Sequence, residues 1–261
     1  MILVVFATEQ EAGPFLEGAS WEREEIGNRP MFRRRADAPA VSRRSTPPST
    51  AAGRPATGWE GREEEKTIGV LICGMGQVNA AQALTAYLER RAKPDLIIMG
   101  GCAGAFRGGS AVAGDVCFAT EEIYADTGIN SPEGFRGLEK TGIPLSEAEG
   151  AKYYNRFPVH DLSGRVAGEG FTFKIFSGPF ATVSAVSGTE MSAAGIEKTW
   201  RPLCENMEGA AAAHVSLLYK APFAEVRGIS NMAEDRDRAR WDIPKACANC
   251  AAVIKELMEK I

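Results

Sequence analysis

Three runs of aliphatic and β-branched residues, set between turns of small residues and helical patterns, most constrain the fold of this chain. The runs are residues 2–6, 67–73 and 95–99, and glycine-rich turns follow the second and third of them. Continuous apolar runs of this length are typical of strands that are buried on both faces of a sheet. We therefore expect an α/β fold in which a mixed central β-sheet is flanked by helices, in a single domain.

The composition favours a globular protein that acts on small molecules. Its 261 residues are 44% hydrophobic and 25% charged, which is enough for one large domain with a buried core. The net charge of −4 provides no general attraction to nucleic acid or to an anionic membrane. The apolar start of the chain lacks a basic leader, and no run approaches the ~18 apolar residues of a membrane helix. We expect a cytoplasmic protein with neither nucleic acid nor membrane as a partner.

The cysteines and histidines give no metal pattern. Six cysteines lie in apolar or helical settings, as expected for reduced thiols. Cys247 and Cys250 have CxxC spacing, but no second cysteine or histidine pair lies nearby. One of the two histidines, His214, follows a run of alanines and is expected to be a core or interface residue. We expect neither a metal nor another cofactor.

Residues 29–66 differ in composition from the rest of the chain. They contain clusters of arginine, a Pro-Pro pair, many small polar residues and a run of three glutamates. Such a composition cannot bury enough apolar surface to order itself. We expect a flexible insertion within the domain 1–261.

A closely packed helix with carboxylates at its N-terminus is predicted for residues 204–214, Cys-Glu-Asn-Met-Glu-Gly-Ala-Ala-Ala-Ala-His. Glu205 and Glu208 are three residues apart and are expected on neighbouring faces of the first helical turn. Glu11 follows the first strand, at the edge where open α/β sheets bind ligands. For each carboxylate the simpler alternative is an acidic residue that only stabilises a helix start.

Several stretches resemble the nucleoside phosphorylase and nucleosidase superfamily. They are residues 74–81, 101–105 with 114–116, 206–210 and 227–231. The resemblance runs from the first strand to the last helix, except for the insertion. Within the superfamily the chain resembles the nucleosidases that hydrolyse methylthioadenosine and S-adenosylhomocysteine, and more closely the futalosine hydrolases of menaquinone biosynthesis. Members commonly complete their pocket with a partner subunit, which implies a homodimer or higher homo-oligomer.

The resemblance also implies roles for single residues. Glu11 matches the carboxylate that activates water, Arg227 matches an arginine that supports the carboxylates, and Glu208 matches a ribose-binding residue. The remaining residues of the implied substrate site are Met207, Asn206, Cys102, Ala103, Gly104, Phe180, Thr182 and Val183. The glycine turns at 74–76 and 100–104 are expected to bring backbone N–H groups close to an anion, a water or the ligand.

The residue at position 231, an asparagine, indicates which base the substrate carries. Related nucleosidases have an acidic residue at this position, which suits the amino group of a 6-aminopurine. An asparagine amide can instead donate to O6 of a 6-oxopurine and accept from a protonated N7. Asn231 and Asn206, which also replaces an acidic residue, therefore favour hypoxanthine as the base released, with Asn231 as a catalytic residue beside Glu11 and Arg227.

Hydrolysis is expected rather than phosphorolysis. The phosphorylases of the superfamily hold phosphate with arginines, at positions where this chain has Met99 and the segment around Glu11. A carboxylate there repels phosphate and suits a nucleophilic water. Three alternatives remain. They are a nucleosidase acting on methylthioadenosine, S-adenosylhomocysteine or aminofutalosine, a non-catalytic nucleoside-binding module, and an NAD-binding enzyme, whose glycine fingerprint is incomplete because Asn79 stands at its third glycine.

Overall fold

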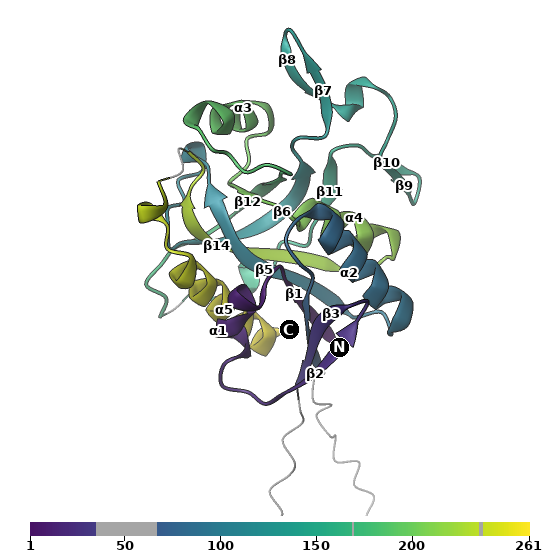
Figure 1. Cartoon of the computed structure of the whole chain (residues 1–261), viewed down its shortest axis with the longest axis vertical. Helices are drawn as coiled ribbons and strands as arrows, with labels where there is room; N and C mark the ends of the chain where they lie inside the picture. Colours follow the sequence, from purple (N-terminus) through teal and green to yellow (C-terminus); the bar gives the residue numbers. More distant parts are fainter. Residues whose placement is uncertain (35–66, 169, 235–236) are drawn as a thin grey trace, which may run out of the picture.

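A central β-sheet lies between two pairs of helices in the computed structural model, which describes residues 1–34, 67–168, 170–234 and 237–261 (Figure 1). The helices are α1 (Glu9–Leu16), α2 (Gln77–Arg90), α3 (Glu190–Trp200), α4 (Gly209–Leu218) and α5 (Ile243–Lys260). Helices α1 and α5 pack together on one face of the sheet, and α2 and α4 pack together on the other. The predicted α/β fold with a mixed central sheet and flanking helices is confirmed.

The main sheet has ten strands in the described part of the chain. Along it the order is β11-β6-β12-β13-β5-β1-β4-β3-β2, and β14 pairs with both β5 and β6. The bounds are β1 (Ile2–Phe6), β2 (Trp21–Ile26), β3 (Arg29–Arg34), β4 (Ile68–Ile72), β5 (Leu96–Ala105), β6 (Val116–Tyr124), β11 (Arg156–Pro158), β12 (Ile175–Thr182), β13 (Cys204–Asn206) and β14 (Phe223–Met232). Short 3₁₀ turns lie at Arg107–Gly109, Leu138–Lys140, Ser163–Arg165 and Arg238–Arg240.

Strand β1 shows why a continuous apolar run is needed at the centre of the sheet. Side chains alternate between the faces of a strand, so Leu3 and Val5 pack towards α2 and α4. Ile2, Val4 and Phe6 pack towards α1 and α5. Because helices cover both faces, all five residues of the strand are buried.

One half of the sheet closes on itself. Strands β5, β14, β6, β12 and β13 pair in a ring, in which each strand has two neighbours. One hydrophobic cluster draws residues from all five strands and fills the interior of this small barrel. Its members on the strands are Ala103, Ala105, Cys117, Ala119, Phe180, Cys204 and Ile229. The sequence predicted a mixed sheet but not this closure.

The four strands β1, β4, β5 and β14 run parallel to one another where they pair, so their carboxyl ends meet at one edge of the sheet. The turn from β1 into α1 and the turn at Gly74–Gly76 leave the sheet there, and β14 carries Arg227 and Asn231 towards the same edge. The topology therefore collects segments that are far apart in the sequence at one place.

The predicted insertion begins later than its composition indicated. Arg29–Arg34 is strand β3, which pairs with β2 and with β4. This part of the prediction is corrected: Met31 is buried in the core, and β4 supplies hydrogen-bond partners that composition alone does not reveal. The remaining residues, 35–66, lie outside the described part of the chain.

Two further regions differ from the predictions. Residues 126–165 are rich in glycine, proline and polar residues, which predicts loops and short helices, but they contain two hairpins that rise at the top and side of Figure 1. These are β7 (Gly128–Ser131) with β8 (Gly134–Gly137), and β9 (Ser146–Ala148) with β10 (Ala151–Tyr153). The sequence on either side of Gly178 predicts two strands, at 173–176 and 179–186. They form the single strand β12, because an irregularity after Gly178 bends the strand without ending it.

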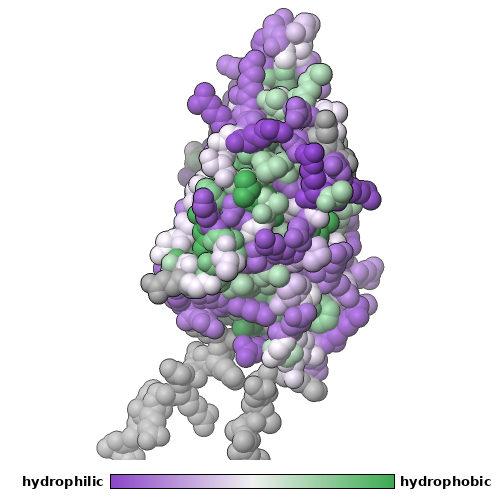
Figure 2. Space-filling model, turned by 90° about the vertical axis from the view of Figure 1, so that its left-hand side faces the viewer, coloured by the Kyte–Doolittle hydropathy of each residue, from purple (hydrophilic) through white to green (hydrophobic). Residues whose placement is uncertain are grey.

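The surface is mixed in character. Figure 2 shows one face on which hydrophilic side chains dominate and hydrophobic ones emerge in its middle. Within the described residues, no helix combines the length and the hydrophobicity that crossing a membrane requires.

Candidate active site

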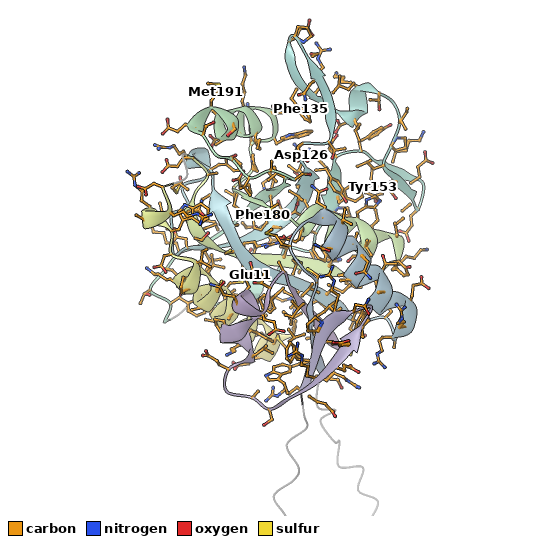
Figure 3. All side chains as sticks on the ribbon, viewed as in Figure 1. Glu11, Asp126, Phe135, Tyr153, Phe180 and Met191 are labelled. Carbon is orange, nitrogen blue, oxygen red and sulfur yellow. The ribbon has the colours of Figure 1, made fainter. Side chains whose placement is uncertain are left out.

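Glu11 lies between the end of β1 and strand β5, on helix α1 (Figure 3). Its Oε2 accepts hydrogen bonds from the backbone N–H and the hydroxyl of Thr8, at 3.1 and 3.2 Å, in a capping box at the start of α1. Its Oε1 accepts the backbone N–H of Cys102 at 3.1 Å. Glu11 therefore stabilises a helix start, as the simpler alternative proposed, and is also fixed against the glycine-rich segment of β5.

Glu208 is held at the N-terminus of α4 from two directions. Its Oε1 accepts the backbone N–H of Gly76 at 2.8 Å, and its Oε2 lies 3.3 Å from Nη2 of Arg227. The turn at Gly74–Gly76 was expected to meet an anion, and the anion is the carboxylate of Glu208. A carboxylate can accept about four hydrogen bonds, so these two contacts leave Glu208 able to accept from further hydroxyl groups.

Arg227 connects the two carboxylates. Its side chain is buried, and each of its three nitrogens has a separate partner: Nε donates to Glu225 Oε1 at 2.8 Å, Nη2 to Glu208, and Nη1 to the carbonyl oxygen of Cys102 at 3.3 Å. The pKa of Arg227 stays above its already high usual value, because the carboxylates of Glu225, Glu208 and Glu11 outweigh the effect of burial. A side chain at Gly101, whose φ is +153°, would lie 2.7 Å from both Arg227 Nη1 and Glu11 Oε1, so only glycine fits between them.

Asn231 lies near the end of β14 with its amide oriented by two neighbours. Its Oδ1 accepts the hydroxyl of Ser230 at 2.7 Å, and its Nδ2 donates to the carbonyl oxygen of Met232 at 2.8 Å. One amide hydrogen and one lone pair of the side chain are left by these two contacts. Asn231 and Met207 are both half-buried, as expected of side chains at the wall of a cavity.

Asn206 and Thr182 support the start of α4 from behind. Asn206 Oδ1 accepts the N–H groups of Glu208 and Gly209 at 3.0 and 2.8 Å, and Thr182 Oγ1 accepts that of Ala210 at 2.7 Å. Both side chains are buried in these contacts, which support the start of α4, and their contact with a substrate stays a prediction. Helix α4 obtains its N-terminal capping from these two residues rather than from Glu208 itself.

The other residues predicted near the substrate lie partly in the core and partly on β5. Phe180 lies in the barrel interior (Figure 3). Val183 packs beside α3, and both side chains are fully buried. The cause is the closure of the barrel, which turns this part of β12 inward. Glu205 lies in β13 and not in a helical turn, where it accepts the N–H and hydroxyl of Ser187. Ala103 and Gly104 lie on β5, beside Ser230 and Asn231.

Two buried carboxyl groups next to the site were not predicted from the sequence. Glu122 on β6 and Glu225 on β14 are completely buried side by side behind Arg227. Each interrupts a strand of otherwise mainly apolar residues. A carboxylate in such a strand must be paired to be tolerated, and that signal was available in the sequence.

The cysteines and histidines have local packing contacts. The Cys102 thiol lies 3.5 Å from Glu11 Oε1 and is hydrogen-bonded to Cys247, which raises its pKa. His214 packs against Phe157, with ring centroids 4.4 Å apart, and burial lowers its pKa. Across the described residues, no group of three or more histidine, cysteine and acidic side chains is arranged to hold a metal ion.

A separate cavity of about 460 Å³ lies at the other end of α4. It is lined by the β9–β10 hairpin, the C-terminal half of α4 and the segment at 220–223. The buried carboxylates described above lie at the N-terminal end of α4, so the candidate site does not depend on this cavity.

Comparison with known proteins gives a family from the sequence and a shared fold from solved structures. Residues 2–259 match the phosphorylase superfamily. The futalosine hydrolase of Thermus thermophilus is 36% identical over 189 residues, which cover 72% of this chain and 80% of that protein. The 5'-methylthioadenosine/S-adenosylhomocysteine nucleosidase of Maridesulfovibrio salexigens is 27% identical over 77% of this chain and 85% of that protein.

Solved structures agree in fold. The 5'-methylthioadenosine/S-adenosylhomocysteine nucleosidase of Neisseria meningitidis, in complex with methylthio-immucillin-A, superposes with a TM-score of 0.75 at 20% identity, covering 100% of this chain and 99% of that one. The predicted superfamily and the predicted enzyme class are thereby confirmed. The chain belongs to the phosphorylase superfamily, and within it to the nucleosidases, enzymes that hydrolyse an N-glycosidic bond.

Proposed function

We propose that this enzyme hydrolyses the N-glycosidic bond of futalosine, releasing hypoxanthine and dehypoxanthine futalosine in menaquinone biosynthesis. The observation that carries the proposal is the oriented amide of Asn231, at the carboxyl end of the strand that also holds Arg227. Futalosine hydrolases from Thermus thermophilus and Acidothermus cellulolyticus, at 36% and 35% identity, support it.

In this proposal Glu208 binds the ribose and Glu11 activates the water that attacks it. Cleavage passes through an oxocarbenium-like state, so the ribose must be held while a nucleophile attacks C1′. The free acceptor positions of Glu208 bind ribose hydroxyls, with Met207 against the sugar. Glu11 accepts a proton from the attacking water. Arg227 touches neither reactant and acts as a positioning residue, because its guanidinium fixes Glu208 and the Cys102 carbonyl.

Asn231 recognises the base in this proposal. The contacts to Ser230 and Met232 fix which end of the amide carries the donor. The remaining N–H can donate to O6 of hypoxanthine, and the remaining lone pair of Oδ1 can accept from a protonated N7. Both bonds stabilise hypoxanthine as a leaving group.

Water is favoured over phosphate as the nucleophile. Two carboxylates, Glu11 and Glu208, lie beside the reaction centre, and the guanidinium that contacts Glu208 is engaged by Glu225 and the Cys102 carbonyl as well. Coulomb repulsion from the carboxylates opposes a phosphate dianion at this place.

Adenine nucleosides are the second candidate substrates. The 5'-methylthioadenosine/S-adenosylhomocysteine nucleosidases at 27% and 29% identity, and the solved structures that share the fold, favour this alternative. Asn231 disfavours it, because an amide that already donates to Met232 presents its second donor, and not an acceptor, to the position of an amino group.

The experiment is base release in phosphate-free buffer from futalosine, aminofutalosine, methylthioadenosine and S-adenosylhomocysteine, with both products identified by mass spectrometry. We expect hypoxanthine and free dehypoxanthine futalosine from the first substrate, at a kcat/KM at least about tenfold above that for the others. A requirement for phosphate, or a preference for any adenine nucleoside, would refute the assignment.

We also propose a cytoplasmic location and a homodimer or larger homo-oligomer. Met75 and Val78 are 63% and 82% exposed beside the turn that holds Glu208, and such apolar side chains suit a subunit contact next to the pocket. Sedimentation of the parent and of Val78→Glu at equal concentration tests this, because the charged variant is expected to dissociate.

A further inference from the structure

The candidate site has more buried acids than buried bases. Four carboxyl groups, those of Glu11, Glu208, Glu225 and Glu122, surround the single guanidinium of Arg227 in the described part of the chain, and all five side chains are buried. Isolated ionised carboxylates are too costly to bury, so such a cluster retains protons. The question is which carboxyl group carries one.

The carboxyl groups of Glu122 and Glu225 both lie close to the backbone at Gly209. A Cβ atom built on Gly209 would lie 2.1 Å from Glu122 Oε1 and 2.4 Å from Glu225 Oε2. The two carboxyl groups therefore meet directly above the first residue of α4, where a hydrogen bond between them is within reach. Two carboxylates cannot form that bond unless one of them is protonated.

Glu225 Oε2 confirms that a proton is required. It is buried, and it has no hydrogen-bond donor among the described residues if every carboxyl group is ionised. The other oxygen of Glu225 accepts from Arg227 at 2.8 Å. A proton on Glu122 supplies the donor that Glu225 Oε2 lacks.

The charges around the pair decide which partner keeps the proton. Burial raises the pKa of Glu225 as well, but the adjoining guanidinium of Arg227 acts against this and favours its ionised form. Glu122 lies further back on β6, where Asn206 Nδ2 and Thr182 Oγ1 lie 2.6 and 2.7 Å from its oxygens. Burial and the neighbouring Glu225 raise the pKa of Glu122 well above its usual range.

We propose that Glu122 is a positioning residue of the nucleosidase reaction: it remains protonated and donates to Glu225, so that ionised Glu225 orients Arg227, and Arg227 orients Glu208. The chain of contacts is Glu122 to Glu225, Glu225 to Arg227 at 2.8 Å, and Arg227 to Glu208 at 3.3 Å. Its kinetic consequence rests on the proposed function, whereas the protonation of Glu122 does not.

The protonation state is tested first, without substrate. Isotope-edited infrared spectra of protein labelled with ¹³C-glutamate at the side-chain carboxyl report protonated carboxylic acids separately from carboxylates. At about pH 8, where exposed glutamates are ionised, we expect a buried carboxylic acid band in the parent that is absent from Glu122→Gln. A parent without the band, or a band unchanged in Glu122→Gln, overturns the proposal even if the enzyme cleaves futalosine.

The positioning role is tested with two variants of similar size. Glu122→Gln keeps a donor for Glu225 and an acceptor for the Thr182 hydroxyl, so we expect kcat/KM within about threefold of the parent. Glu122→Leu removes the donor, and we expect kcat/KM to fall at least about tenfold. Equal losses in both variants, with both folded by circular dichroism, contradict a role for the donated proton.

A pH profile separates this role from simple packing. The titratable groups near Glu122 are Glu225 on β14, Cys204 on β13 and Tyr124 on its own strand. Arg227 and Glu208 act on its partner Glu225. Loss of the shared proton at alkaline pH would leave two adjacent carboxylates, so the kcat/KM of the parent should decline there more than that of Glu122→Gln. Superimposable profiles refute the proposal. Should no nucleoside be cleaved, the proposed function fails, and the infrared result still decides the state of Glu122.

Discussion

Arg227 donates its Nε hydrogen to Oε1 of Glu225 across 2.8 Å, and both side chains are fully buried. The other two nitrogens of the same guanidinium contact Glu208 and the Cys102 carbonyl, so one side chain joins β14, β5 and the start of α4. Only a planar group with several donors can serve three such acceptors at once.

Replacement of Arg227 by lysine should therefore damage both activity and stability. The ammonium group of a lysine at this position would reach at most part of this set and leave buried acceptors unpaired. We expect kcat/KM to fall at least about tenfold and the unfolding free energy by about 2 kcal/mol or more. Arg91→Lys is the control, because Arg91 pairs with Glu24 at a partly exposed site. Similar small effects of both changes in calorimetry and kinetics would contradict the assigned role of Arg227.

Loss of either catalytic carboxylate should reduce turnover without unfolding the protein. Glu11→Gln and Glu208→Gln remove a charge with little change in volume, and each is expected to lower kcat/KM by ~10²-fold or more. Glu205→Gln is the matched control, since Glu205 is a buried carboxylate next to α4 that accepts from Ser187. The site is misplaced if all three variants keep the parent rate.

The elements predicted correctly are those with a local signal. Continuous apolar residues identified β1, β4 and the start of β5. Thr189 followed by Glu190 has the pattern of a helix start, and Thr189 forms a capping box at the start of α3. The barrel was missed because it depends on pairings such as β14 with β6, which bring together residues far apart in the sequence. Strand β13 has only three residues, too few for a periodic pattern.

The site was predicted in part for a similar reason. Glu11, Glu208 and Arg227 stand in stretches that resemble a known family, and the structure brings them into one hydrogen-bonded group. Whether Thr182 and Asn206 face a substrate or the back of a helix depends on how β12 and β13 are turned within the barrel. That orientation follows from packing between distant strands and has no local sequence signal.

The segment between β3 and β4 should be replaceable. Arg33 pairs with Gly69 in antiparallel strands, so the two strand ends lie side by side. A Gly/Ser linker of about five residues can connect them in place of residues 37–64. We expect turnover and the melting temperature to stay close to those of the parent. A folded deletion variant without activity would assign a functional role to the arginine clusters.

Stability should depend on pH through Glu122. Because the pKa of Glu122 is higher in the folded than in the unfolded protein, the folded state holds this proton more tightly. The stabilisation is therefore complete at low pH and is lost as the pH rises through the folded-state pKa. We expect the melting temperature of the parent to fall more steeply than that of Glu122→Gln as the pH rises above neutrality. Parallel curves would show that Glu122 does not hold the proton.

The base preference should change when Asn231 becomes aspartate. Nδ2 of Asn231 donates to the Met232 carbonyl, so Asn231→Asp removes that donor together with the one proposed to face O6 of hypoxanthine. An unpaired buried polar group costs about 1–3 kcal/mol, so kcat/KM for futalosine should fall at least about tenfold. The new carboxylate accepts from an amino group, so the ratio of kcat/KM values should move towards aminofutalosine.

A matched change elsewhere separates recognition of the base from loss of a backbone contact. Asn249 Nδ2 donates to the Gly114 carbonyl at 2.6 Å, on helix α5, and Asn249→Asp also exchanges an amide donor for a carboxylate. This control should lower stability while leaving the ratio of the two kcat/KM values unchanged. Both ratios are measured with futalosine and aminofutalosine, which differ only in the group at C6. If Asn231→Asp also leaves the ratio unchanged, Asn231 does not read the base, and the choice of futalosine loses its main physical support.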